Sequence, residues 1–416
     1  MFRKASAVFA VIAAVSTLVS AEINFDTPKH SSLQQEIANL ELSVPSAVPA
    51  EDKAAKPDKE WTVMVFVNAK NNLERYGLLD MNEMEMIGST DKVNVVVELG
   101  RIAGYDSSDG NWVSSRRYLV KKDNDFKKVT SPVVKDLGKV DMGDYKHLID
   151  FANWAKTTYP AKKYMLVVWN HGAGWIKTRG DSVKGISYDD ETGNHMTTPQ
   201  LGLAMKAIGK VDVYGSDACL MQMPEVNYEI KDYADYIVGS EETEPGDGYT
   251  YNLLLGPLVA KPAMSGAELG KLTVNAYADH YGTQDHTQSL IKSAAMTGLV
   301  PVVNNFVKAA MASGEKALVK TALNGAQSYA YPENKDLWHF LSLYAASSKD
   351  ANVKTAAKSL QDYLTGTLVL HNRVNSTYSD SHGLAIYMPG SANSAYNELA
   401  WAKAAQWDEF INWYSK

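Results

Sequence analysis

One cysteine and one distant histidine are the side chains of this 416-residue chain whose types and positions suit nucleophilic chemistry. The only cysteine, Cys219, lies in VYGSDACLM, just beyond the apolar run 211–216. His171 holds the matching place beyond another apolar run, 164–170, in MLVVWNHGAGW. A thiolate is a strong nucleophile, and an imidazole can withdraw the thiol proton and later deliver a proton to a leaving amine. The pair therefore predicts covalent catalysis by attack of sulfur on a carbonyl carbon.

The segments around the two residues predict that they meet at one edge of a sheet. Both apolar runs are short and bounded by turn residues, a pattern typical of strands buried on both faces of a parallel sheet. Between them, residues 198–209 have apolar residues at helical spacing and end in glycine, so strand, helix and strand form a right-handed crossover. Active sites of open α/β sheets lie beyond the carboxyl ends of the strands. We therefore expect His171 and Cys219 to lie side by side.

Strand and helix patterns alternate along the rest of the chain, which predicts an α/β fold with an open, mostly parallel sheet flanked by helices on both faces. The expected catalytic domain is 60–290, and the C-terminal region, 291–416, is mostly helical by periodicity with a late strand. Further strands are predicted at 61–69, 93–100, 236–240, 288–293 and 383–389, helices at 78–88, 145–159 and 404–414, and a hairpin at 110–123.

The first residues have the pattern of a secretory signal. Two basic residues precede an apolar run and a small-residue cleavage site that ends at Ala21, so residues 1–21 are expected to be a signal peptide. Residues 22–59 are polar and contain several prolines, which predicts a disordered spacer or a propeptide. No later stretch is apolar for long enough to span a bilayer. The expected location is therefore secreted or periplasmic.

Composition and charge favour a soluble globular protein and narrow the choice of partners. The chain is 45% hydrophobic and 21% charged, and its formal net charge of −7 argues against a general nucleic-acid surface. One cysteine cannot form a disulfide within the chain, although secretion would permit one. A lone cysteine is commonly a buried packing residue, but the position of Cys219 at a strand end opposite a histidine favours a nucleophile.

Five segments, in the order in which they occur, resemble the clostripain family of caspase-like cysteine peptidases: WTVMVFVNAKNNLE, YMLVVWNHGAGW, GISYDDETG, GSDACLMQMPEVNYEI and GSEETEPGDGYTY. The resemblance runs from about Trp61 to the C-terminus and is strongest between Tyr164 and Tyr251. It implies a caspase-like fold and a His171/Cys219 dyad that cuts after arginine or lysine, often in an enzyme that matures by cleaving itself. The expected partners are protein or peptide substrates with a basic P1 residue, and the expected form is a monomer or a self-cleaved two-chain enzyme.

Backbone N–H groups and carboxylates complete the predicted site. A tetrahedral oxyanion needs preorganised donors, and Gly172 can offer its N–H beside that of Cys219 because no side chain blocks the approach. A buried carboxylate would bind a basic P1 side chain through charge-assisted hydrogen bonds. Asp217 is the first candidate, because it ends the strand before Cys219 and, by resemblance, matches the family's P1-binding acid. Asp247, in EPGDGYTY, is the second candidate.

Simpler structural roles compete with these interpretations. The side chain of Asp217 also suits the capping of a local turn. Gly174 is expected to be a turn residue rather than a donor to the oxyanion. The acidic run that contains Glu241, Glu242 and Glu244 is expected to form a solvated face rather than part of a pocket, because charge runs usually face water.

The segment between the predicted dyad residues suits self-cleavage. Lys177, Arg179 and Lys184 lie in WIKTRGDSVKGISYDD, a polar, glycine-containing loop of the kind that proteases cut. By resemblance, Lys184 before Gly185 best matches the place where relatives are processed, and a cut there would leave the two dyad residues on separate chains. An unprocessed surface loop is the alternative.

No cofactor is required by the predicted chemistry, and no metal ligands are assigned. The resemblance leaves room for a calcium ion, because some relatives depend on one and Asp189, Asp190 and Glu191 form an acidic cluster. The ligand spacing of an EF-hand is absent. Lys70 and Lys292 stand where relatives tend to carry acids, which predicts altered ion binding or specificity there.

Two other functions stay open at this point. A secreted protein of this fold can be a non-catalytic binding module in which Cys219 only packs. An asparaginyl-type relative would keep the dyad and change the pocket. The presence of both dyad residues, the following glycine and the pocket acid favours an enzyme, and the acidic candidates favour a basic P1 residue.

Overall fold

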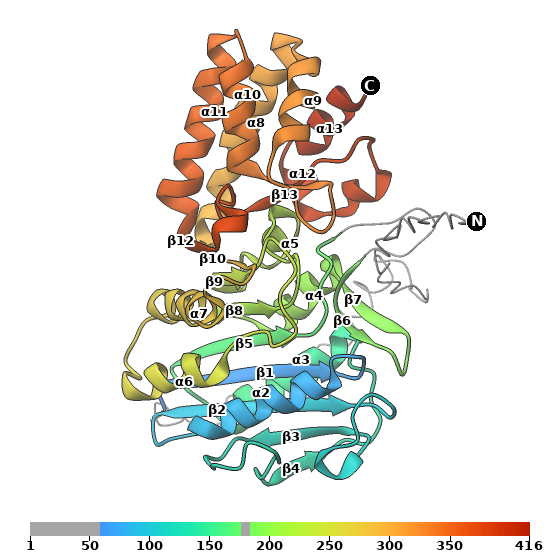
Figure 1. Cartoon of the computed structure of the whole chain (residues 1–416), viewed down its shortest axis with the longest axis vertical. Helices are drawn as coiled ribbons and strands as arrows, with labels where there is room; N and C mark the ends of the chain where they lie inside the picture. Colours follow the sequence, from blue (N-terminus) through green and yellow to red (C-terminus); the bar gives the residue numbers. More distant parts are fainter. Residues whose placement is uncertain (1–58, 176–183) are drawn as a thin grey trace, which may run out of the picture.

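A nine-stranded sheet forms the centre of the computed structural model, which describes residues 59–175 and 184–416 (Figure 1). Its five central strands are parallel, and every residue of β1 and β2 is buried. Burial on both faces explains why these strands read as continuous apolar runs in the sequence. The central strands lie in the order β9 (Ala234–Gly239), β8 (Val211–Asp217), β5 (Lys163–Trp169), β1 (Trp61–Ala69) and β2 (Val93–Arg101).

Antiparallel strands extend the sheet at both edges. The added strands are β3 (Ser115–Leu119) and β4 (Val133–Asp136) beyond β2, and β10 (Thr287–Lys292) and β12 (Val369–Val374) beyond β9. The hairpin predicted at 110–123 is wrong, because this segment contains the single strand β3, whose partners are β2 and β4. The α/β fold class and its largely parallel centre are confirmed.

Side chains alternate along β1 between two apolar layers, as the period of a strand requires. Met64 and Phe66 belong to one layer, whereas Val63, Val65 and Val67 belong to the other. Helices supply the outer side of each layer. The first layer contains α3 (Tyr145–Thr158), α4 (Thr198–Ile208) and α5 (Pro224–Ile230), and the second contains α2 (Glu74–Ile87), α6 (Tyr251–Ala260) and α7 (Gly266–Tyr281).

The crossover between β5 and β8 is the element that positions the candidate site. Its helix α4 begins with a capping box between Thr197 and Gln200 and ends at Gly209, which has a φ of 72°. The capping box fixes the start of the helix and Gly209 fixes its end, so β8 starts in register beside β5. A short antiparallel pair, β6 (Gly185–Asp189) and β7 (Asn194–Thr197), precedes α4 and was not predicted.

The C-terminal helices gather beyond one end of the sheet (Figure 1). Their apolar faces continue the first layer, and β12 returns to pair with β10 in the main sheet. The predicted strand at 383–389 is the shorter β13 (Ala385–Tyr387), which pairs only with β11 (Asn334–Asp336). The helices are α8 (Met296–Ser313), α9 (Lys316–Gly325), α10 (Leu337–Ser347), α11 (Ala351–Tyr363), α12 (Ala400–Ala404) and α13 (Trp407–Ser415).

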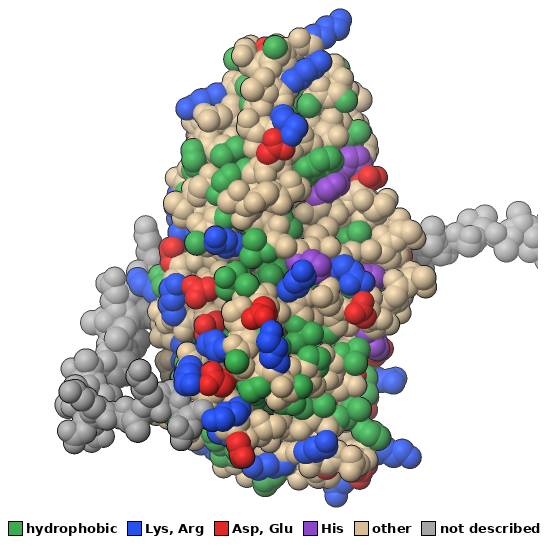
Figure 2. All heavy atoms as spheres, turned by 90° about the vertical axis from the view of Figure 1, so that its left-hand side faces the viewer, with side chains coloured by type: hydrophobic (Ala, Val, Ile, Leu, Met, Phe, Trp, Pro, Cys, Tyr) green, Lys and Arg blue, Asp and Glu red, His purple; other side chains and the backbone are tan. Residues whose placement is uncertain are grey.

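The surface carries both signs of charge. Figure 2 shows basic and acidic side chains interspersed on the face that forms the left-hand side of Figure 1. A mixed face of this kind does not attract a polyanion, in line with the formal net charge of −7. Within the described residues, no helix is long and apolar enough to cross a membrane. The predicted signal peptide, 1–21, lies outside the described residues.

Candidate active site

His171 lies at the switch point of the sheet topology. The connection from β1 to β2 passes through α2 in one layer, whereas that from β5 to β8 passes through α4 in the other. Sites of open α/β sheets form where neighbouring connections leave on opposite faces. His171 follows β5, Asn72 follows β1, and His171 Nε2 is 2.7 Å from Asn72 Oδ1. The hydrogen bond therefore joins two loops that diverge at the switch point.

The segments that carry His171 and Cys219 lie against each other, as the crossover predicts. Asn170 N–H donates to Asp217 C=O at 3.2 Å, which continues the pairing of β5 with β8 beyond their ends. A Cβ added to Gly172 would lie 2.3 Å from the carbonyl oxygen of Cys219. Real Cβ atoms do not approach an oxygen so closely, so glycine is needed where the two segments meet.

A short hairpin holds the backbone of His171 from the other side. Ser187 N–H donates to His171 C=O at 3.3 Å, and Ala173 N–H donates to Gly185 C=O at 2.9 Å. Neither bond uses the Gly172 N–H. Ser187 and Leu220, the residue after Cys219, have φ values of 65° and 62°. Positive φ is costly for residues other than glycine, and such strain concentrates at functional sites.

Burial favours the uncharged forms of the thiol and the imidazole. Burial raises the pKa of Cys219 to about 12, although Glu244 N–H donates to its Sγ at 3.2 Å. Burial lowers the pKa of His171 to about 4. With Asn72 Oδ1 as acceptor, Nε2 of the neutral ring carries the proton and Nδ1 is the basic nitrogen. Asn72 is a functional candidate that the sequence analysis missed.

Asp217 is a buried acid with two donors from a neighbouring loop. Its side chain accepts hydrogen bonds from Tyr249 N–H at 2.9 Å and Tyr251 OH at 2.8 Å, and the residue is 3% exposed. Both donors lie far along the chain, so capping of a local turn does not explain the residue. Burial raises the pKa of Asp217 to about 7 despite these hydrogen bonds. The surroundings of Asp217 therefore compensate for a negative charge only in part.

Three further acids lie near Asp217. Asp80, fully buried, accepts from Trp169 Nε1 at 2.6 Å, and Glu83 accepts from Tyr251 N–H at 2.8 Å. Burial and the charge of Asp217 raise the pKa of both acids, that of Glu83 to about 7. Glu244 is the third. Asp80 and Glu83 are one turn apart on α2, a spacing that could have marked them in the sequence.

Asp247, the second predicted pocket acid, lies on an exposed part of the same loop as Glu244. Its charge acts on Asp80 and Glu83 and raises the pKa of each, as a secondary cause after burial. Asp247 therefore lies at the rim of the acidic group, whereas Asp217 lies inside it. Gly174, expected to be a turn residue, has a φ of 59°.

The expectation of a solvated acidic face at 241–244 is wrong. Glu241 is 1% exposed and accepts from Tyr329 OH at 2.8 Å. Glu242 is 6% exposed and accepts from Tyr378 OH at 3.0 Å. Donors from the C-terminal region compensate for the burial of these carboxyls, and a sequence offers no sign of such distant partners.

The acidic cluster after β6 holds a lysine ammonium. Lys70 Nζ lies 2.9 Å from Asp189 Oδ2 and 2.8 Å from Glu191 Oε2, and it donates to Val140 C=O at 2.6 Å. The Lys70 side chain is 1% exposed. Across the two described stretches, no three or more His, Cys, Asp or Glu side chains are arranged to hold a metal ion. Lys292, the other basic departure, is exposed at the end of β10.

Of the three predicted processing residues, Lys184 alone lies within the described part of the chain. Lys177 and Arg179 lie outside the described residues. Lys184 is 4% exposed, and Gly185 begins β6, where it pairs with Thr197. Cleavage of the Lys184–Gly185 bond therefore requires this segment to leave its place beside Ala173.

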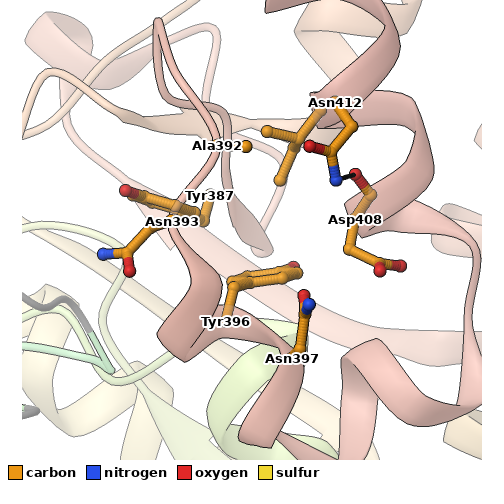
Figure 3. A pocket seen from close by; sticks show the side chains of 8 residues that line it. Tyr387, Ala392, Asn393, Tyr396, Asn397, Asp408 and Asn412 are labelled. Atoms are coloured by element: carbon orange, nitrogen blue, oxygen red, sulfur yellow. Dashed lines mark hydrogen bonds between the residues drawn. The ribbon is translucent and has the colours of Figure 1, made fainter.

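A small polar hollow lies apart from these residues, in the C-terminal region (Figure 3). Its volume is about 10 Å³, which holds about one water molecule. It contains none of the acids near Asp217 and neither dyad residue. The hollow is lined by Tyr387, Ala392, Asn393, Tyr396, Asn397, Asp408, Ile411 and Asn412.

Comparison with known proteins shows what the chain is similar to. Residues 65–414 match the model of the clostripain family. The chain is 25% identical over 237 residues to "Clostripain" of Hathewaya histolytica, an alignment that covers 49% of this chain and 43% of that protein. The matched part thus spans less than half of that relative's length.

Two solved structures share the fold. One is a secreted C11 cysteine protease from Bacteroides thetaiotaomicron in complex with an irreversible peptide inhibitor, with 22% identity, a TM-score of 0.62, and coverage of 84% of this chain and 99% of that chain. The other is an inactive zymogen C11 protease from Parabacteroides distasonis, with 18% identity, a TM-score of 0.63, and coverage of 86% and 100%. At these identities, the likeness concerns the fold.

Gly172→Ala tests the close contact between the two segments. The added methyl group would overlap the Cys219 carbonyl oxygen, so we expect a loss of about 1–3 kcal/mol in the free energy of unfolding. Urea unfolding measures this loss. Gly390→Ala is the control, because Gly390 is exposed and an added Cβ meets nothing within 4 Å. Equal stability of the two variants would contradict the geometry.

Proposed function

Because the chain belongs to the clostripain family of cysteine peptidases, we propose that it is an endopeptidase that cuts after arginine or lysine, with Cys219 as nucleophile and His171 as base. The observation that carries the proposal is the buried carboxyl of Asp217 at the end of β8, two residues before the only cysteine. A buried acid in this position can select a positively charged side chain while the neighbouring thiol attacks the carbonyl group of the same residue.

The neutral resting pair suits a mechanism in which the proton moves during attack. Cys219 Sγ forms a bond to the scissile carbonyl carbon while His171 Nδ1 takes the thiol proton. The oxyanion accepts hydrogen bonds from the N–H groups of Gly172 and Cys219. The imidazolium then protonates the leaving amine as the C–N bond breaks. Water hydrolyses the remaining thioester, with His171 again as base.

The preference for a basic P1 residue follows from the cost of buried charge. A carboxylate removed from water is unfavourable unless a cation or several donors compensate for it. The raised pKa of Asp217 indicates that its two donors are not enough. A guanidinium or ammonium group supplies the missing charge, and Asp247 at the rim adds attraction for the same cation.

We extend the proposal to location and maturation. The signal-like pattern at 1–21 and the likeness to a secreted protease support secretion. Self-cleavage at Lys184 is supported by the pairing of Gly185 with Ala173, which places this basic residue near the dyad. Release of the buried Lys184 segment would have to come first, and Lys177 and Arg179 remain alternative sites.

We also propose that the chemistry needs no calcium. The support is Lys70, whose ammonium group lies between the carboxylates of Asp189 and Glu191 and so supplies the positive charge of the acidic cluster. A divalent cation with oxygen ligands would need that same space.

A fluorogenic peptide series that varies only P1 (Arg, Lys, Asn, Asp, Leu) tests the proposed reaction. We expect turnover confined to Arg and Lys, unchanged by EDTA, and lost in Cys219→Ala; intact mass would report any self-cut. Turnover of Asn alone would favour the asparaginyl-type pocket. No turnover by the intact wild-type chain, with calcium supplied, would favour a binding module.

The pH dependence should differ between basic and neutral P1 residues. Asp217 binds a cation in its ionised form, and its pKa is raised to about 7, so kcat/KM for an Arg substrate should fall as the pH drops below about 7. His171, with a pKa lowered to about 4, stays neutral over this range. A substrate with citrulline at P1 serves as the control. Parallel falls for both substrates would assign the titration to the dyad instead.

Asn72→Ala tests the orientation of the histidine. Loss of the acceptor on Nε2 leaves the ring free to turn and to carry its proton on Nδ1, so we expect kcat to fall about tenfold or more with little change in KM. Arg75→Ala, an exposed change one residue into α2, is the control. A rise in KM alone would place Asn72 in substrate binding.

A further inference from the structure

Glu244 contacts both parts of the proposed site. Its backbone N–H donates to Cys219 Sγ at 3.2 Å. Its side chain turns toward the sheet, where Oε1 accepts from Gln288 Nε2 of β10 at 3.0 Å. Its Oε2 is buried, and no N–H or O–H group of the described residues donates to it. One residue therefore links the nucleophile to a carboxyl that still lacks a hydrogen-bond donor.

The carboxyl groups of Glu244 and Asp217 interact, and their contact raises the pKa of Glu244 and lowers that of Asp217. Two carboxylates in contact repel each other, which favours a single proton shared between them. Burial and the charge of Asp217 hold the pKa of Glu244 well above its usual range. These opposite shifts favour Glu244 over Asp217 as the carrier of a shared proton.

Further acids and several tyrosines surround the pair. On α2, Asp80 and Glu83 lie close enough to Asp217 and to Asp247 for both charges to raise their pKa values, after burial as the main cause. Burial raises the pKa of the tyrosines that pack around the pair from α6, α7 and the loop before α6, and the charge of Asp217 adds to the shift in all four and that of Glu244 in all but Tyr251. The affected tyrosines are Tyr249, Tyr251, Tyr277 and Tyr281. A cation that enters this group finds acids on several sides.

We propose that Glu244 is a specificity-determining residue, and that the cationic P1 side chain takes the place of the proton that Glu244 and Asp217 share. This inference rests on the proposed preference for basic P1 residues and adds a residue to it. The guanidinium or ammonium group then binds two carboxylates instead of one, and a single proton passes to solvent for each substrate bound. The O–H bond of the Glu244 carboxyl breaks, its proton passes to water or buffer, and no other covalent bond changes in this step.

The position of Glu244 also explains how recognition of the P1 charge can affect Cys219. Recognition of the P1 charge moves a proton off the same residue whose backbone N–H contacts Cys219 Sγ. A neutral P1 side chain leaves the proton in place and the pair joined. Cationic and neutral substrates should therefore differ by more than the attraction of one carboxylate.

The first experiment compares substrates that differ only in the P1 charge. Peptides with Arg or the neutral isostere citrulline at P1 are used with the wild-type chain and Glu244→Gln. We expect the Arg-to-citrulline ratio of kcat/KM to fall at least about tenfold in the variant, with the citrulline rate little changed. Glu244→Gln keeps the shape of the side chain and the backbone N–H, so a merely structural role would leave the ratio unchanged.

Glu229→Gln is the matched control. Glu229 is a half-buried glutamate on α5 whose pKa burial raises to about 7, and it accepts from Ala400 N–H at 2.7 Å. The change removes a comparable carboxyl away from the acids near Asp217. Its Arg-to-citrulline ratio should equal that of the wild-type chain. An equal fall in both variants would contradict the proposal.

The second experiment counts protons and holds even if Glu244→Gln folds poorly. Acetyl-Leu-Arg-amide is titrated into the full-length Cys219→Ala chain at pH 8, in buffers of different ionisation enthalpy. The pKa of Asp217 is raised to about 7 and that of Glu244 well above its usual range, so Glu244 is the expected source of a proton released at this pH. We expect release of up to one proton per peptide bound, and close to none with Glu244→Gln added. Binding without proton release would overturn the proposal.

Failure of this inference can be told apart from failure of the proposed function. Without a preference for basic P1 residues, the wild-type chain would show no difference between Arg and citrulline, and the Arg peptide would not bind. If only the role of Glu244 is wrong, the wild-type chain would cut after Arg while Glu244→Gln keeps the same ratio and the same proton count.

Discussion

The contact between Gly172 and the Cys219 carbonyl is the constraint on which the rest of the site depends. Parallel pairing of β5 and β8 brings the two strand ends together, but a Cβ at position 172 would keep the following residues apart. The loop after β1 and the hairpin β6–β7 then fix the histidine from two sides. The arrangement follows from backbone packing, so neither His171 nor Cys219 depends on a third charged group for its place.

Two groups of titratable side chains meet at the end of β8: the thiol and imidazole of Cys219 and His171, and the acids around Asp217. Burial favours the neutral forms of the Cys219 thiol and the His171 imidazole over an ion pair. Burial also raises the pKa of Asp217 and of Glu244 beside it. A positively charged side chain bound beside these acids would stabilise their ionised forms, and in the proposed function it would bring the adjoining carbonyl carbon to the sulfur. The proposed function thus couples specificity to attack through two residues of one strand end.

The sequence predicted the parts of the site that obey local rules. Short apolar runs, a glycine-ended helix and the crossover rule placed Cys219 beside His171, and the end of the same strand together with the family resemblance indicated Asp217. The sequence did not predict the proposed roles of Asn72 and Glu244, because these roles depend on where the loops after β1 and β9 lie. The sequence shows the carboxylates of the acidic cluster after β6, which are typical ion ligands. It does not show their pairing with Lys70, because that pairing joins residues far apart in the chain.

The loop after β9 connects the C-terminal region to the candidate site, which lies outside that region. Glu241 and Glu242 point into that region and bind the hydroxyls of Tyr329 and Tyr378, while Glu244 points back toward Asp217. Buried carboxyls are costly without donors, so these tyrosines help set the path of the loop that contacts Cys219. With β12 also part of the main sheet, the C-terminal helices act as a brace for the pocket rather than as an independent unit.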